Sequence, residues 1–146
     1  MESDKSPLFQ LIDKVSFFDV FSKSEKYEII KINSIVKKYE KKDLTIFSEG
    51  DEGGSAVIIL AGQVNIIKSS TPNAKKGRVS LRDPKTVILA KLGVGSVFGE
   101  VSLLSNKRRT TGVVTSTPLV IVLEINKQDL QAFNPSIQNK FQSQFI

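Results

Sequence analysis

The residues best suited to chemistry lie in one segment of this 146-residue chain, residues 93–111. Its glycine-flanked turn leads into a short helical turn at 100–104, and free backbone N–H groups at a helix start attract anions. Arg109 follows on the outgoing strand and can donate two hydrogen bonds to a phosphate. Glu100 would repel a phosphate, but its carboxylate accepts hydrogen bonds from ribose hydroxyls. Together these groups suit a ribose joined to a cyclic phosphodiester.

The composition removes most enzyme chemistries. The chain contains no histidine, so it lacks the commonest general base and the commonest metal ligand. It contains no cysteine, which excludes disulfides, thiolate metal sites and a cysteine nucleophile. Serine–histidine triads and imidazole-based zinc or iron sites are excluded with them. We therefore expect a binding protein that is not an enzyme and that carries no cofactor or metal.

The charge pattern favours a mixed-charge surface with a weak preference for anions. The formal net charge is +6. The lysines are spread over 23–42, 68–91 and 107–140, where most are interleaved with aspartate and glutamate. Such interleaving is typical of a solvated surface, while the excess of positive charge attracts small anionic ligands.

No segment indicates export or membrane insertion. Residues 1–10 lack the apolar stretch of a signal peptide. The longest apolar run, 56–61, is far shorter than the about 20 residues that span a bilayer. We expect no membrane span in this chain and a cytoplasmic location.

Helices are predicted at both ends of the chain. Apolar residues at helical spacing indicate helix within 7–21, and Ser24 has the character of an N-cap for a second helix. Near the other end, Asn126 is suited to begin a helix. Pro135 fits the first turn of a further helix that runs over 136–145.

Between the helices, the sequence has the pattern of β-strands. The run 55–60 predicts a buried strand, and the turn 61–63 predicts that 64–67 returns as its antiparallel partner. Further short strands at regular spacing indicate a mainly β fold: an antiparallel β-roll or jelly roll, the double-stranded β-helix of cupins, with N-terminal and C-terminal helices. We expect a single domain over 1–146. Its predicted parts are an N-terminal helical segment, the roll and the C-terminal helices, at 1–33, 34–125 and 126–146.

The segment that begins at Phe98 resembles the phosphate-binding cassette of cyclic-nucleotide-binding domains. Phe98-Gly99-Glu100-Val101-Ser102-Leu103-Leu104, followed by Arg109-Thr110, matches the family's pattern in residue type and spacing. The family includes the bacterial catabolite activator, the regulatory subunits of protein kinase A and cyclic-nucleotide-gated channels. The resemblance extends from Phe9 to Pro135, with further matches at 46–51, 58–64, 92–95 and 130–135.

The resemblance implies a role for each residue of the cassette, 93–111. Glu100 would accept a hydrogen bond from the ribose 2′-OH, and Arg109 would bind the exocyclic oxygens of the cyclic phosphate. Gly99 would allow close approach, and backbone amides near Ser102 and Thr110 would complete the anion cradle. The implied ligand-binding residues are Val97, Phe98, Gly99, Glu100, Val101, Ser102, Arg109 and Thr110.

The implied ligand is cAMP, and Thr110 leaves cGMP open. In several family members a threonine or serine at this place bonds the guanine amino group or the phosphate, whereas alanine is common in strict cAMP sensors. Our hypothesis for the mechanism is a binding switch, in which phosphate capture would draw 100–104 inward and the closing helices from Asp129 onward would repack over it. The signal would pass to a protein effector of unknown identity.

Two positions depart from the family's pattern. Gly54 stands where the early turn of the family has its second acidic residue, and Val57 replaces an aromatic residue in the following strand. Both positions concern the turn and the core, so they bear on the details of the fold more than on ligand contacts.

Several alternatives stay open. Glu100 and Arg109 can form a structural ion pair in a roll that binds no ligand and instead contacts another protein. Arg108 can assist the phosphate, and Phe141 or Phe145 can cover the base as a lid. A cupin-like enzyme would need histidine ligands for a metal. The chain can also be the sensor part of a transcription regulator, but it contains no recognition helix, so we expect no direct DNA binding.

Overall fold

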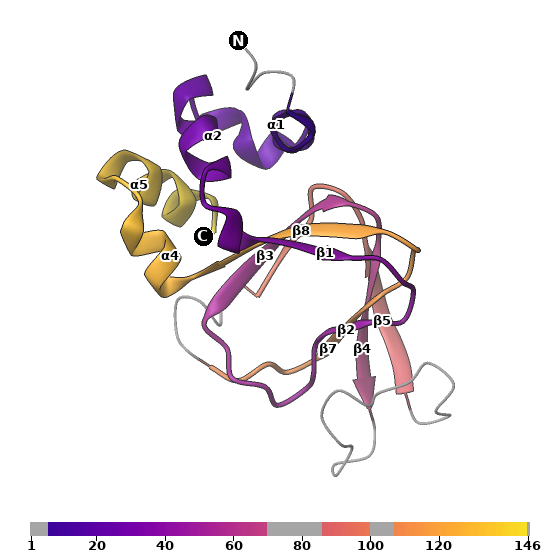
Figure 1. The fold of residues 1–146 in the computed structure, drawn as a ribbon. Coiled ribbons are helices and arrows are strands. Elements are labelled where there is room, and N and C mark those ends of the chain that lie inside the picture. Colours follow the sequence, from indigo (N-terminus) through magenta and orange to yellow (C-terminus); the bar gives the residue numbers. More distant parts are fainter. Residues whose placement is uncertain (1–5, 70–85, 100–106, 146) are drawn as a thin grey trace.

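The computed structural model of the chain describes residues 6–69, 86–99 and 107–145. Within them, two antiparallel four-stranded sheets form a roll, and the helices gather beside it (Figure 1). The strands are β1 (Val36–Tyr39), β2 (Thr45–Phe47), β3 (Ser55–Ala61), β4 (Val64–Ser69), β5 (Thr86–Leu92), β6 (Val97–Phe98), β7 (Gly112–Thr115) and β8 (Val120–Asn126). The helices are α1 (Pro7–Asp13), α2 (Lys23–Ile30), α4 (Lys127–Ala132) and α5 (Pro135–Gln144), with 3-10 helices η2 (Ser16–Val20) and η3 (Asn33–Ile35). The predicted mainly β roll with helices at both ends is confirmed.

Each sheet combines strands from distant parts of the chain. The strand orders are β1-β8-β3-β6 in the first sheet and β2-β7-β4-β5 in the second. In the first sheet β3 lies antiparallel to β8, with Ala56 opposite Ile125. The chain passes between the two sheets at almost every strand, as the winding of a jelly roll requires.

Two apolar layers hold the roll together, and β3 contributes to both. Successive side chains of a strand point to opposite faces. Ala56, Ile58 and Leu60 pack in the layer that includes the helices. Val57 and Ile59 pack in the layer that includes strands of the second sheet. Because both faces of β3 are buried, its sequence is continuously apolar rather than alternating.

The predicted hairpin between 55–60 and 64–67 is wrong. β3 belongs to the first sheet and β4 to the second, so the two strands follow each other without pairing. The chain turns at Gly62, whose φ is +82°, and a Cβ atom there would collide with the carbonyl oxygen of Leu119. This glycine corner directs the chain across to the second sheet instead of back along β3.

The helices from the two ends of the chain pack against each other beside the first sheet (Figure 1). A cluster of buried phenylalanines joins them: Phe17, Phe18, Phe21, Phe133, Phe141 and Phe145. Phe141 is at the centre, with ring centroids 4.9 to 6.5 Å from those of the other five. Neither Phe141 nor Phe145 lines the cavity of the roll, so the lid alternative has no support in this arrangement. Within the described part of the chain, none of the helices combines the length and apolar character needed to cross a membrane.

The helix starts show how far local signals reach. The predicted starts at Asn126 and Pro135 are confirmed in α4 and α5. The predicted cap at Ser24 is wrong, because Ser22 caps α2. Ser22 stands three residues before Glu25. The Ser22 hydroxyl accepts from the Glu25 N–H, and the Glu25 carboxylate accepts from the Ser22 N–H. Two reciprocal hydrogen bonds stabilise the helix start more than the single bond that Ser24 could offer.

Glu25 also ties α2 to α5. Its carboxylate accepts hydrogen bonds from Lys140 Nζ at 2.5 Å and from Ser136 Oγ at 2.8 Å. Only 12% of the Glu25 side chain is exposed. The bond from Lys140, followed by that from the Ser22 N–H, lowers the pKa of Glu25 from 4.5 to about 2. The ionised carboxylate is therefore a link between the two ends of the chain.

This link predicts a specific loss of stability in acid. The pKa of Glu25 is lower in the folded state than in the unfolded state, so its contribution is complete above pH 4.5 and disappears as the pH falls through 2. Between pH 5 and pH 2 we expect the unfolding free energy of the wild type to fall by roughly 2 kcal/mol more than that of Glu25→Gln.

Denaturant unfolding at pH 5, 4, 3 and 2 measures this difference. Glu28→Gln is the matched control, because Glu28 lies on the same helix with its side chain 56% exposed in a surface pair with Lys31. Parallel pH profiles for the wild type and Glu25→Gln would show that the link contributes nothing.

Candidate ligand-binding pocket

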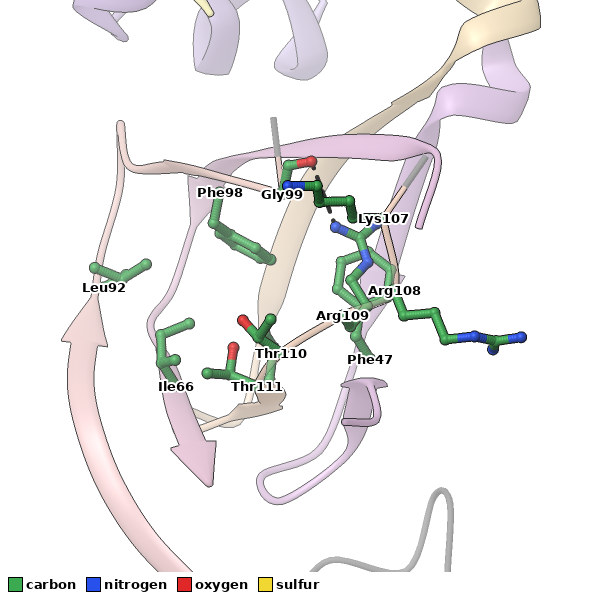
Figure 2. A pocket seen from close by; sticks show the side chains of 11 residues that line it. Phe47, Ile66, Leu92, Phe98, Gly99, Lys107, Arg108, Arg109, Thr110 and Thr111 are labelled. Carbon is green, nitrogen blue, oxygen red and sulfur yellow. Dashed lines mark hydrogen bonds between the residues drawn. The ribbon is translucent and has the colours of Figure 1, made fainter. Parts of the chain in front are cut away.

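A cavity of about 300 Å³ opens on the inner side of the roll, between β6 and strands of the second sheet (Figure 2). Most of its walls are apolar, and a run of basic residues borders one side. The lining residues are Phe47, Ile66, Leu92, Phe98, Gly99, Lys107, Arg108, Arg109, Thr110, Thr111 and Val113. The cavity therefore combines an apolar interior with local positive charge.

Arg109 is the most constrained of these basic residues. Its backbone N–H donates to the carbonyl of Asp51, and its own carbonyl accepts from the Gly50 N–H, both at 2.8 Å. Its guanidinium Nη2 donates to the carbonyl and the hydroxyl of Ser55, at 2.9 and 2.8 Å. Nη1 lies 3.5 Å from the carbonyl of Gly99 (Figure 2). Only 7% of Arg109 is exposed, so its guanidinium is a buried, oriented cation.

The guanidinium still has bonding capacity. It lies over the ring of Phe47, with Cζ 3.8 Å from the ring centroid, which is cation–π geometry. Its Nε is buried and has no hydrogen-bond partner among the described residues. Burial lowers the pKa of Arg109, while the negative charges of Glu124 and Asp51 act against that shift. Because a guanidinium is a very weak acid and does not lose its proton in proteins, the group stays charged.

Gly99 brings the backbone of the cassette close to Arg109. Its φ is +82°, a left-handed conformation that suits glycine. A Cβ atom there would collide with Nη1 of Arg109 and would lie 2.8 Å from the carbonyl oxygen of Ser55. Glycine is therefore required both by the backbone conformation and by the approach of the guanidinium.

The structure brings together half of the predicted ligand-binding set. Phe98, Gly99, Arg109 and Thr110 line the cavity. Val97, their neighbour on β6, lies opposite Ile58 and packs against the helical layer. The other predicted residues, Glu100, Val101 and Ser102, lie outside the described residues, as does the turn 100–104.

Two residues that hold the Arg109 guanidinium in place, Phe47 and Ser55, lie outside the predicted ligand-binding set. Phe47 supplies the ring beneath Arg109, and Ser55 supplies two of the acceptors for its guanidinium. The only signal for Ser55 is a polar residue at the start of an otherwise apolar strand. Arg108, considered as a helper of the phosphate, is exposed at the rim and donates to the carbonyl of Gly50 at 3.1 Å.

The family described as "Cyclic nucleotide-binding domain" matches residues 36–134. A comparison with curated protein sequences found no match. Among solved structures, a cyclic nucleotide-binding domain from Methylobacillus flagellatus KT is similar, with 26% identity and a TM-score of 0.64. That match covers 94% of this chain and 71% of the other.

Two further structures share the fold at lower identity. The regulatory domain of Toxoplasma gondii protein kinase A, solved with cAMP, is 17% identical with a TM-score of 0.64, over 97% of this chain and 49% of that one. The catabolite activator protein of Thermus thermophilus is 21% identical with a TM-score of 0.62, over 87% of this chain and 55% of that one. The family's match extends over more than half of the sequence, from β1 to the end of α4 and beyond. The chain therefore belongs to the cyclic nucleotide-binding domain family.

Proposed function

We propose that the cavity binds a cyclic nucleotide, cAMP or cGMP, and that the cyclic phosphate contacts Arg109. The observation that carries this proposal is a buried guanidinium at the cavity wall with an N–H donor that no described residue satisfies. A buried charge with an unused donor costs free energy until an acceptor reaches it. A phosphate oxygen supplies the acceptor and the opposite charge together.

The rest of the cavity suits the nucleoside. Its volume, about 300 Å³, is at the lower end of the range for small-ligand pockets. The apolar side chains of Phe47, Phe98 and Leu92 offer surfaces for a base and a sugar edge. We assign Glu100 to the ribose 2′-OH, and the backbone around Gly99, Val101, Ser102 and Thr110 to the phosphate oxygens. The related Toxoplasma gondii domain was solved with cAMP, which makes cAMP the first ligand to test.

We propose further that the module regulates a protein effector and catalyses no reaction. β6 offers a short route from ligand to helices, because Phe98 lines the cavity while its neighbour Val97 packs against the helical layer. A ligand that shifts Phe98 would therefore disturb the packing of the helical layer through Val97. A ligand shifts the equilibrium between two arrangements of the helices only as far as its affinities for the two arrangements differ.

Calorimetric titration of the wild type with cAMP, cGMP and linear 5′-AMP tests the proposed ligand. Saturable binding of a cyclic nucleotide, with 5′-AMP at least about tenfold weaker, is the expected result, because only the cyclic ester holds the phosphate against the ribose as the cassette requires. A folded protein that binds neither cyclic nucleotide would be a roll that serves protein contact instead.

A matched pair of arginine variants tests the assigned contact. Lysine keeps the positive charge but cannot donate two parallel hydrogen bonds. We expect Arg109→Lys to weaken cyclic-nucleotide binding about thirtyfold, since it loses one charge-assisted hydrogen bond. Arg108→Lys, next to it on the rim, should stay within about twofold. Equal losses in the two variants would assign the effect to general positive charge rather than to Arg109.

A further inference from the structure

A second group of polar side chains lies behind Arg109, on the first sheet. Nη2 of Arg109 donates to the hydroxyl of Ser55 at 2.8 Å, and that hydroxyl donates to Oε2 of Glu124 at 3.1 Å. The serine hydroxyl accepts from the arginine and donates to the glutamate. The two hydrogen bonds therefore point the same way and form a relay from Arg109 to Glu124. The relay connects the guanidinium to a carboxylate that does not line the cavity.

The register of the first sheet places Ser55 close to Glu124. Glu124 of β8 lies opposite Val57 of β3, so Ser55 is its diagonal neighbour on the same face. The turn before β3 ends in Gly54, so no acidic side chain directly precedes Ser55. Glu124 is half-buried, and its charge acts on Arg109 strongly enough to oppose the lowering of the arginine pKa by burial. Asp51 makes the smaller contribution of the two carboxylates.

We propose that Glu124, acting through Ser55, is the counter-charge of Arg109 and thereby opposes the binding of an anionic ligand. The inference rests on the proposed function, because the ligand is a cyclic phosphate. Glu124 is a positioning residue: it orients the guanidinium and sets the electrostatic cost of adding a second negative charge beside it. The affinity of the cavity for a cyclic nucleotide is therefore set partly by Glu124, which the ligand does not contact.

The charge of Glu124 can be removed with little change in shape. Glutamine keeps an oxygen that accepts from Ser55, but it no longer repels a phosphate. We expect Glu124→Gln to bind cAMP about fivefold more tightly than the wild type, and the gain to shrink as salt is raised from 50 to 500 mM, roughly the range over which screening becomes strong. A purely structural role predicts the opposite direction, because a damaged site binds more weakly.

Two variants serve as controls in the same titrations. Glu124→Asp retains the charge, so its affinity should return to within about twofold of the wild type. Glu40→Gln makes the same change in net charge at a side chain that is 71% exposed, and it should leave the affinity unchanged. If the wild type binds cAMP while Glu124→Gln binds it equally or more weakly, the opposing role of Glu124 is overturned.

A measurement without ligand separates this inference from the proposed function. Unfolding free energies of Glu124→Gln, Arg109→Met and the double variant form a thermodynamic cycle. A counter-charge predicts that the double variant loses less stability than the sum of the single losses, because removing one partner leaves the other charge uncompensated. Additive losses would overturn the counter-charge whether or not the wild type binds a nucleotide. Absence of binding together with strong coupling would overturn only the proposed function.

Discussion

Replacing Phe141 with alanine is expected to lower the free energy of unfolding by about 4 kcal/mol. The side chain is fully buried, and its ring meets five other phenylalanine rings from both ends of the chain. The substitution leaves a cavity between α5 and the N-terminal helices, and rigid aromatic neighbours can close it only in part. The expected loss is therefore in the middle of the range of about 3 to 5 kcal/mol for a buried aromatic residue.

Equilibrium unfolding in urea measures this loss. Gln142→Ala is the control, because Gln142 is the next residue on α5 and is exposed, so its truncation should change stability by less than about 0.5 kcal/mol. A loss below about 1.5 kcal/mol in Phe141→Ala would mean that the aromatic cluster relaxes around the cavity. The helices would then be joined mainly by polar links such as that of Glu25 with Lys140.

Substituting alanine for Gly99 is expected to weaken cyclic-nucleotide binding by about a hundredfold or more. The added Cβ would collide with Nη1 of Arg109, so the guanidinium must leave the position that Ser55 and Gly99 now define. Two charge-assisted hydrogen bonds to the phosphate would be lost or misdirected, each worth about 1.5 to 3 kcal/mol. This effect exceeds that of Arg109→Lys, which leaves one such bond.

Gly50→Ala separates collision from backbone strain. Gly50 has a similar φ, +88°, but a Cβ atom there would meet no other atom within 4 Å. Both variants carry the cost of a left-handed alanine, about 1 kcal/mol of stability. Only Gly99→Ala should lose binding in a titration with cAMP. If both variants bind as the wild type does, the contact between Gly99 and Arg109 is not part of the binding site.

Local signals in the sequence were sufficient for much of the fold. The apolar run of β3 predicted a buried strand, and Asn126 and Pro135 marked the starts of the closing helices. These signals act within a few residues, through side-chain periodicity and through caps that bond to the nearest backbone N–H groups. The cassette was also recognisable, since Phe98, Gly99 and Arg109 lie within 12 consecutive residues, 98–109.

What the tertiary structure decided depends on pairs that are distant in the sequence. The predicted hairpin failed because β3 has both faces buried, so its own pattern cannot show which strand pairs with it. Two acceptors of the Arg109 guanidinium belong to Ser55, which lies 54 residues before the arginine, and the carboxylate of Glu124 lies 69 residues after Ser55. No local rule joins such residues, because the register of β3 against β8 places Ser55 near Glu124, and backbone hydrogen bonds to Gly50 and Asp51 place Arg109 beside the start of β3. The sequence by itself thus determined the elements and the arginine, while the packing of the two sheets determined which groups hold that arginine in place.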